Sequence, residues 1–162
     1  MNPYKKVFSE LQKSGVKYLV VGGVAVNLYG YSRFTGDIDI LLTLDSSNLS
    51  KMEKVMKKLG YVERLPVQLH ELKDKKKVKK WLKEKGMTAY TFISSKKPQL
   101  DIDILVGYSL DFKKFYKNRT VIKVWGMNLS VISFDDLILM KKKAGREKDL
   151  LDLQALLELK SL

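Results

Sequence analysis

Two motifs decide the fold of this 162-residue chain: Val21-Gly22-Gly23 and, after a spacer of thirteen residues, Asp37-Ile38-Asp39-Ile40. The apolar segment Lys17–Val21 predicts a short strand that runs directly into the two glycines, and Val24–Tyr29 predicts the helix that follows. Glycine lets a backbone approach a phosphate closely, and the first turn of a helix has free N–H groups. The Gly-Gly pair therefore predicts a phosphate-binding turn, with an ordinary tight turn as the alternative.

The Asp-Ile-Asp-Ile segment predicts a strand, about residues 36–43, that carries two acids on one face. Side chains alternate along a strand, so Asp37 and Asp39 share a face while the isoleucines pack behind it. Two neighbouring carboxylates repel each other unless a cation lies between them. A pair of divalent ions ~3.5–4 Å apart is common where phosphates react. The segment therefore predicts a metal site, and a solvated acidic pair on an edge strand is the alternative.

A second acidic strand is predicted at Leu100–Leu105, where Asp101 and Asp103 again alternate with apolar residues. If it lies beside the first, up to four carboxylates gather, and burying them requires metal or protonation. We favour Asp103 as the third site residue, because the apolar run Ile104-Leu105-Val106 keeps it inside the sheet. Asp101 lies nearer the turn at Lys96-Lys97-Pro98, where solvent or a lysine would meet it.

The residue types present restrict the kind of metal. The chain has no cysteine and a single histidine, His70. Thiolate sites, cysteine nucleophiles and multi-histidine sites within one chain are therefore excluded. Oxygen ligands remain, and they point to Mg²⁺ or Mn²⁺.

The chain is strongly basic, with 31 Lys and Arg residues against 18 Asp and Glu residues and a net charge of +13. Such a charge favours polyanions such as nucleotides, RNA or DNA, although a lysine-rich surface also serves solubility or thermal stability. The segment Lys73–Lys85 holds eight lysines against Asp74 and Glu84. It includes apolar residues that predict an amphipathic segment: Val78, Trp81 and Leu82. It is a candidate nucleic-acid contact, or else a solvated basic face.

The remaining pattern predicts one small domain over residues 1–162, of the α/β or α+β class. The core covers about residues 15–132 and a helical tail about 133–162.

The apolar stretches are strand-length, and no apolar segment follows the two N-terminal lysines. We therefore expect neither a membrane span nor a signal peptide, and we expect a cytoplasmic location. The other expected elements are helices at about 4–13, 48–59 (capped by Ser46 or Ser47), 111–117, 133 onward (capped by Ser133) and 147–160, strands from Tyr61 and at 88–93 and 99–106, and a hairpin at 121–131 turned at Trp125-Gly126.

Taken together, these motifs resemble the DNA polymerase β-type nucleotidyltransferase superfamily. Its signature is an apolar residue, Gly-Gly or Gly-Ser, a spacer, Asp-apolar-Asp and a third acid on a later strand. Arg33–Asp39 resembles the RxTxDxD form of small prokaryotic members, and Gly23 stands where serine is commoner. The tail, Asp136–Lys141 and Ala144–Leu153, is similar to that of abortive-infection nucleotidyltransferase toxins.

The resemblance implies a small mixed sheet flanked by helices and an enzyme that moves an NMP from an NTP to a hydroxyl acceptor. The acceptor could be an RNA 3′ end, a protein or a small molecule. Asp37 and Asp39 would hold two Mg²⁺ (or Mn²⁺) ions, while Asp103 would bind the second metal and help deprotonate the acceptor. Toxin-like members are often paired with an antitoxin, so an antitoxin-like protein is an expected partner.

Several other residues are candidates for contacting the nucleotide. Gly22 and Gly23 would meet the phosphates through their backbone. Arg33 could reach a phosphate or be a surface loop residue, and Lys141 and Arg146 could bind the nucleotide or form a helix–helix salt-bridge network. The competing function is a non-catalytic module of the same fold that binds nucleotides or nucleic acid.

Overall fold

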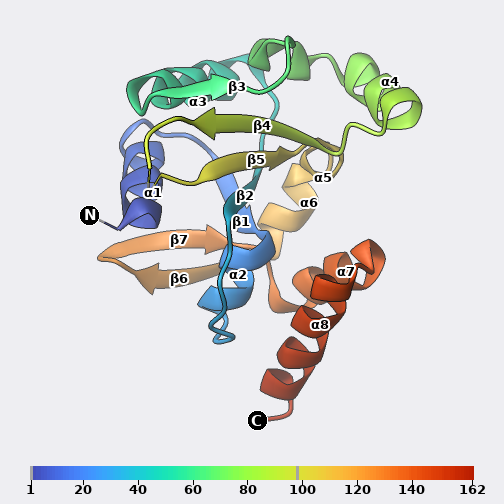
Figure 1. Cartoon of the computed structure of the whole chain (residues 1–162). Helices are drawn as coiled ribbons and strands as arrows, with labels where there is room; N and C mark the ends of the chain where they lie inside the picture. The colour runs from blue at the N-terminus through green and yellow to red at the C-terminus, as the bar shows by residue number, and fades with distance from the viewer. Residues whose placement is uncertain (1, 98) are drawn as a thin grey trace.

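The computed structural model describes residues 2–97 and 99–162, so the predicted turn residue Pro98 lies outside the described residues. A mixed sheet with strand order β3-β4-β5-β2-β1-β7-β6 forms the centre of the molecule (Figure 1). Helices surround this sheet, and the last two, α7 and α8, lie together beside it. The mixed sheet and the helical tail confirm the predicted fold class.

The middle of the sheet is formed by β1 (Tyr18–Val21), β2 (Asp37–Leu42) and β5 (Asp101–Leu105). Strand β2 runs antiparallel to β1 and parallel to β5. The isoleucines of β2 and β5 are fully buried, as alternation of apolar and acidic residues predicts. The two acidic strands are therefore neighbours.

The outer strands complete the sheet on both sides. On one side lie β4 (Ala89–Ser94), antiparallel to β5, and β3 (Tyr61–Glu63). On the other, β7 (Met127–Val131) pairs with β1 in parallel and forms a hairpin with β6 (Thr120–Val124). Trp125 and Gly126 both have positive φ, at 53° and 74°, as the predicted two-residue hairpin turn requires.

The helices agree with the expected pattern in most places. Their bounds are α1 (Pro3–Lys13), α2 (Gly22–Leu28), α3 (Ser46–Lys58), α4 (Lys75–Lys85), α5 (Val106–Ser109), α6 (Phe112–Lys117), α7 (Phe134–Ala144) and α8 (Glu147–Lys160), with a 3₁₀ turn, η1 (Leu69–Lys73). Ser133 caps α7 as predicted, since its hydroxyl accepts a hydrogen bond from the backbone N–H of Asp136 at 3.1 Å.

Several boundaries differ from the prediction. Helix α2 begins at Gly22 and not at Val24, so the two glycines form its first turn. Asp45, not Ser46 or Ser47, caps α3, because its carboxylate accepts a hydrogen bond from the N–H of Asn48 at 2.9 Å. Aspartate is as good a cap as serine, so local preference alone could not choose between them. The strand predicted to continue through Val106 ends at Leu105, and Val106 begins α5.

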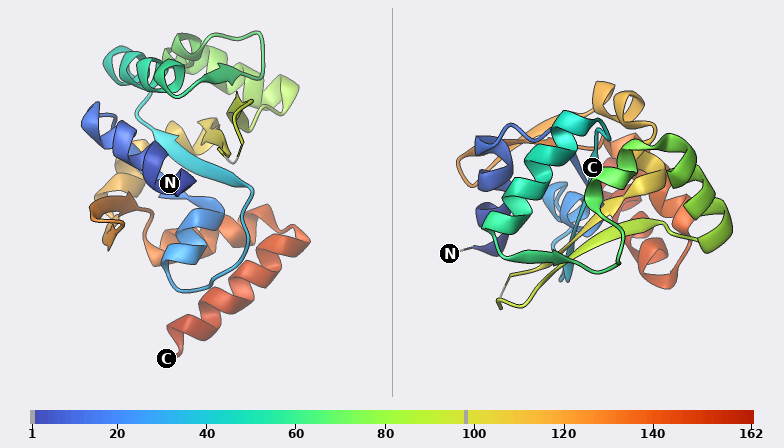
Figure 2. Two further views of the ribbon diagram at one scale, coloured as in Figure 1. Left: turned by 60° about the vertical axis from the view of Figure 1, so that its left-hand side comes forward. Right: turned by 90° about the horizontal axis from the view of Figure 1, so that it is seen from above.

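Most of the basic segment Lys73–Lys85 forms α4, an amphipathic helix. Val78 is fully buried, Trp81 and Leu82 are partly buried, and the lysines of α4 are exposed. In two further views, α4 and α8 lie on different parts of the surface (Figure 2). Among the described residues, no helix is both long enough and apolar enough to cross a membrane.

Candidate active site

Four carboxylates lie at paired positions on two neighbouring strands. Asp37 of β2 is opposite Asp101 of β5, and Asp39 is opposite Asp103. Because the strands are parallel and in register, all four side chains start from the same face of the sheet. The condition that the sequence left open is thus met: the two acidic strands lie side by side.

Among the four carboxylates, Asp39 has the most strongly shifted pKa. Burial, followed by the nearby charges of Asp103 and Asp37, raises its pKa from 3.8 to about 6. Lys141 and Lys148 act in the opposite direction, so the tail helices are close enough to oppose the carboxylates electrostatically. A carboxyl group that is buried beside like charges is a candidate metal ligand or catalytic group.

The other three carboxylates differ in their surroundings. Asp103 accepts a hydrogen bond from the Thr91 hydroxyl at 2.5 Å, and its pKa is raised, chiefly by burial. Asp101 accepts one from the backbone N–H of Ser94 at 3.2 Å, which ties it to the β4–β5 hairpin. Asp37 is exposed at the start of β2. Asp103 is thus oriented by a side chain of β4, while Asp101 is tied to the backbone of the same strand.

The two glycines make room for site residues. Gly22 has a φ of +64°, and a Cβ atom there would lie 2.1 Å from Oδ2 of Asp39. A Cβ atom on Gly23 would lie 2.5 Å from the hydroxyl oxygen of Thr35. Neither position can hold a side chain without moving these neighbours. The close packing of α2 against Asp39 and Thr35 therefore requires glycine at both positions. The contact of these glycines with phosphate stays a prediction.

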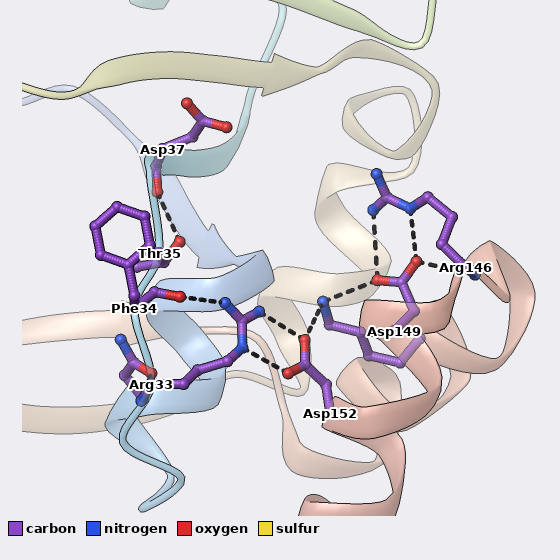
Figure 3. A network of polar contacts seen from close by, with 9 residues as sticks. Arg33, Phe34, Thr35, Asp37, Arg146, Asp149 and Asp152 are labelled. Atoms are coloured by element: carbon purple, nitrogen blue, oxygen red, sulfur yellow. Dashed lines mark hydrogen bonds and ion pairs between the residues drawn. The ribbon is translucent and has the colours of Figure 1, made fainter.

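Arg33 forms an ion pair with a carboxylate of the C-terminal helix α8. Its Nε and Nη2 atoms donate to the two carboxylate oxygens of Asp152, each at 2.6 Å, and Nη1 donates to the carbonyl of Phe34 at 2.7 Å (Figure 3). This fork-to-carboxylate geometry is the strongest form of ion pair. It fixes the irregular loop that leads into Asp37 onto helix α8.

Lys141 and Arg146 belong to the same network. The Lys141 ammonium group is buried and lies 3.1 Å from Asp149 and 2.9 Å from Asp152. Arg146 Nε donates to Asp149 at 2.7 Å, but the Arg146 side chain is 64% exposed. Burial works to raise the pKa of Asp149 and Asp152, yet both stay below the usual range. Hydrogen bonds from Arg146 and Lys141 lower the pKa of Asp149, and those from Arg33 and Lys141 lower the pKa of Asp152.

The network is the salt-bridge arrangement that the sequence offered as an alternative to nucleotide binding. It joins three of the predicted nucleotide-binding residues, so a role in binding stays a prediction for them. Arg146 is the most exposed of the three. Sequence reasoning did not single out Asp152, and its only local signal is an acid in a leucine-rich helix.

The carboxylates fit a divalent cation by the chemistry of their donor atoms and not by a ready-made cluster among the described residues. Within the residues that the structure describes, no three acidic or histidine side chains are arranged so that they could hold one ion. The donor set nevertheless suits Mg²⁺ or Mn²⁺, because Asp39 and Asp103 supply oxygen ligands from paired positions and burial penalises their charge. Asp37 is exposed at the start of β2, two residues before Asp39. Two surface hollows, of about 480 and 410 Å³, lie elsewhere, beside Tyr116 and along α8.

Comparisons with known proteins agree with this arrangement. The sequence profile of a family described as "Nucleotidyltransferase of unknown function (DUF6036)" matches residues 4–161. No curated protein matches the chain. The fold is similar to that of the lincosamide antibiotic adenylyltransferase LnuA, lincomycin-bound, with a TM-score of 0.64 and 16% identity, covering 97% of this chain and 96% of that chain.

Two further solved structures share the fold. The antibiotic-resistance factor ANT(2'')-Ia has a TM-score of 0.60 at 9% identity, covering 95% of this chain and 80% of that chain. An antigenic nucleotidyltransferase-like protein from Paracoccidioides brasiliensis has a TM-score of 0.59 at 14% identity, covering 97% and 75%. These likenesses confirm the nucleotidyltransferase fold.

Proposed function

The chain belongs to the DUF6036 family of nucleotidyltransferases, and from this premise we propose that it moves an NMP from an NTP to a hydroxyl acceptor with the help of a divalent cation. Membership makes the chain a transferase of phosphorus-containing groups. Nucleotidyltransferases of this fold generally use divalent metal ions. The observation that carries the proposal is the paired position of Asp39 and Asp103 beside Asp37, with the Asp39 pKa raised to about 6.

The residues divide the chemical work as follows. Asp37, Asp39 and Asp103 would hold the Mg²⁺ or Mn²⁺ ions, which neutralise triphosphate charge when bound. Asp103 is suited to accept the proton of the acceptor hydroxyl, because burial raises its pKa and the Thr91 hydroxyl orients it. The acceptor oxygen then forms a bond to the α-phosphorus. The bond from that phosphorus to the bridging oxygen breaks, and pyrophosphate leaves.

The acceptor is one of three kinds. A small molecule with a hydroxyl group is favoured by the likeness to LnuA and ANT(2'')-Ia, whose names refer to antibiotics. An RNA 3′ end is favoured by the net charge of +13 and by the exposed lysines of α4. A protein acceptor, and an antitoxin-like partner, are favoured by the resemblance of the tail to toxin-like members.

Transfer of label tests the proposal directly. The protein is incubated with each α-labelled NTP, Mg²⁺ and, separately, total cellular RNA, total protein or a mixture of lincosamides and other antibiotics that carry hydroxyl groups. We expect label in one fraction with the native chain and none with Asp39→Asn. Equal labelling by the variant, or no labelling of any acceptor with any NTP, would contradict the proposal. Thermal stabilisation by an NTP that requires Mg²⁺ supplies an independent measure of the site.

The exposed basic face of α4 favours a second candidate, a module that binds nucleic acid without catalysis. Lys77 is a poor probe, because its ammonium group lies 3.0 Å from the Glu71 carboxylate. Charge reversal of Lys75, Lys76 and Lys79 is cleaner. If α4 binds RNA, affinity falls steeply with salt and the triple variant flattens that slope. Unchanged binding by the variant would remove α4 from the interface.

A further inference from the structure

Arg64 is an exposed arginine directly after β3, the edge strand of the sheet (Figure 1). Its backbone N–H donates to the carbonyl of Thr91 at 3.0 Å, which extends the β3–β4 pairing by one residue. Thr91 is in turn opposite Asp103, and Asp103 is opposite Asp39. These four residues therefore form one row across β3, β4, β5 and β2, and their side chains start from the same face of the sheet.

The positive charge of Arg64 acts on the carboxylates from a distance. Burial raises the pKa of Asp103, and the charge of Arg64 works in the opposite direction. Neighbouring strands are about 4.8 Å apart, so the Cα atom of Arg64 starts about 10 Å from that of Asp103, with β4 between them. None of the ion pairs formed among the described residues includes Arg64. In this it differs from Arg33 and Arg146, which are each paired with an acid of α8, so Arg64 is available to an anion from outside the chain.

The surface beside Arg64 is apolar and open to solvent. Val62, two residues earlier on β3, starts from the same face and is 61% exposed. Its cross-strand partner is Ile93, which is partly buried. A cation beside an exposed apolar surface fits a ligand that combines an anionic group with a ring, and a nucleotide unit has both. The net charge of +13 favours the same class of ligand.

Arg64 and the Gly22-Gly23 turn lie on opposite sides of the carboxylates. The turn follows β1, on one side of Asp39 and Asp103, and a Cβ atom on Gly22 would collide with Asp39. Arg64 follows β3, on the other side. In phosphoryl transfer the attacking and leaving oxygens are roughly in line, so the acceptor approaches from the side opposite the pyrophosphate. Because the glycine turn is the expected contact of the triphosphate, Arg64 lies on the side from which the acceptor comes.

We propose that Arg64 binds the acceptor, and that this acceptor carries a phosphate group next to the hydroxyl that receives the NMP. This role of Arg64 rests on the transfer reaction proposed above. The chemistry that it recognises is a ribose hydroxyl beside a phosphate, which is found at the 3′ end of RNA and in a free nucleotide. A guanidinium group holds a phosphate with two parallel hydrogen bonds, and it would thereby orient the neighbouring hydroxyl toward Asp103.

Binding of a short oligoribonucleotide tests Arg64 without any reaction. The anisotropy of a 5′-labelled oligoribonucleotide with a free 3′ hydroxyl is measured as protein is added, in the absence of NTP. Arg64→Gln should weaken binding about tenfold or more, because charge-assisted hydrogen bonds are lost, and Arg64→Lys should restore part of the affinity. Arg119→Gln is the matched control, because it removes the same charge beside β6, the opposite edge strand, where the guanidinium lies over the Tyr116 ring. No weakening by Arg64→Gln, or equal weakening by the control, would overturn the proposal.

Competition identifies the source of the phosphate. A nucleoside monophosphate that displaces the labelled oligoribonucleotide as well as an unlabelled one does would assign the site to free nucleotides. Displacement by the longer chain alone would assign it to RNA. In both cases the nucleoside that lacks the phosphate should compete at least about tenfold more weakly. A nucleoside that competes equally well would overturn recognition of the phosphate.

Steady-state kinetics separates the role of Arg64 from the transfer reaction itself. Arg64→Gln should raise the KM for the acceptor about tenfold or more, with a smaller change in kcat. Thermal stabilisation by NTP and Mg²⁺ should stay as in the native chain, because Arg64 lies away from the glycine turn. Loss of that stabilisation would place Arg64 at the triphosphate and overturn the proposal, as would an unchanged KM for the acceptor. Absence of transfer by the native chain would contradict the transfer reaction, and the binding measurements would still decide whether Arg64 holds a phosphate-bearing ligand.

Discussion

Replacing Asp39 by Asn should stabilise the protein when no divalent cation is present. In the folded chain, burial and the charges of Asp103 and Asp37 raise the pKa of Asp39 from 3.8 to about 6. This difference corresponds to a cost of roughly 3 kcal/mol for keeping the charged form at neutral pH. Asparagine is nearly the same size and carries no charge, so it removes most of that cost.

The stabilisation should depend on pH in a defined direction. A group whose pKa is higher in the folded state binds its proton more tightly when the chain is folded. Its contribution to stability is therefore fully present below the unfolded pKa of about 4 and is lost as the pH rises through about 6. The native chain should thus lose stability between about pH 4 and pH 7, and the Asp39→Asn variant should lose less. Asp103 adds a slope of the same sign, because its pKa is raised too.

The measurement is denaturant unfolding with a chelator at about pH 4.5 and about pH 7.5. Asp111→Asn is the control, since Asp111 is an exposed acid on the connection to α6 and its variant should follow the native chain. Added Mg²⁺ should stabilise the native chain at the higher pH and leave Asp39→Asn nearly unchanged. An Asp39→Asn variant less stable than the native chain at about pH 7.5 would refute the reasoning.

Three further predictions concern neighbouring positions. In single-turnover assays, Asp103→Asn should slow transfer by orders of magnitude with little change in NTP affinity, and Asp101→Asn should be milder; the reverse order would give Asp101 the catalytic role. Asp152→Asn removes the carboxylate that pairs with buried Lys141 and should lower the free energy of unfolding, measured with denaturant, by about 3–5 kcal/mol. Asp135→Asn breaks only an exposed pair and should lower it little. Gly22→Ala should abolish label transfer and lower the melting temperature, because its Cβ would collide with the Asp39 carboxylate; a fully active variant would contradict this.

The sheet and its acidic pair could be predicted because their signals are local. Alternation of acids and isoleucines fixes which face of β2 each side chain takes. The β6–β7 turn was predictable in the same way, since two residues between alternating segments demand positive φ at Trp125 and Gly126. The sequence left open whether the two acidic strands are neighbours, because strand pairing is not a local property; the structure shows that β2 and β5 pair.

The tail could not be predicted as well, because its contacts are distant in the sequence. Arg33 and Asp152 are 119 residues apart, and nothing in either neighbourhood indicates that they meet. The exposed leucines of α8 also misled the interpretation. The spacing of Leu150, Leu153, Leu156 and Leu157 predicts a core stripe. Leu156 is indeed buried and Leu153 is partly buried, but Leu150 and Leu157 are largely exposed, while Asp149 and Asp152 lie against the protein. Buried acids are rare unless paired, so a sequence pattern favours the opposite orientation.

Helix α8, whose acids Asp149 and Asp152 face the protein, connects the tail to the candidate site. The loop at residues 31–36 has no regular structure of its own, and the Arg33 pair with Asp152 ties it to α8, in addition to its hydrogen bonds with Tyr4 of α1 and Asn27 of α2. Lys141 holds Asp152 in turn, and its charge lowers the pKa of Asp39. The same aspartate therefore fixes the approach to Asp37 and supports the cation that opposes the carboxylates. A substitution at Asp152 should consequently change both stability and the pKa of Asp39, two effects that a purely structural ion pair would not link.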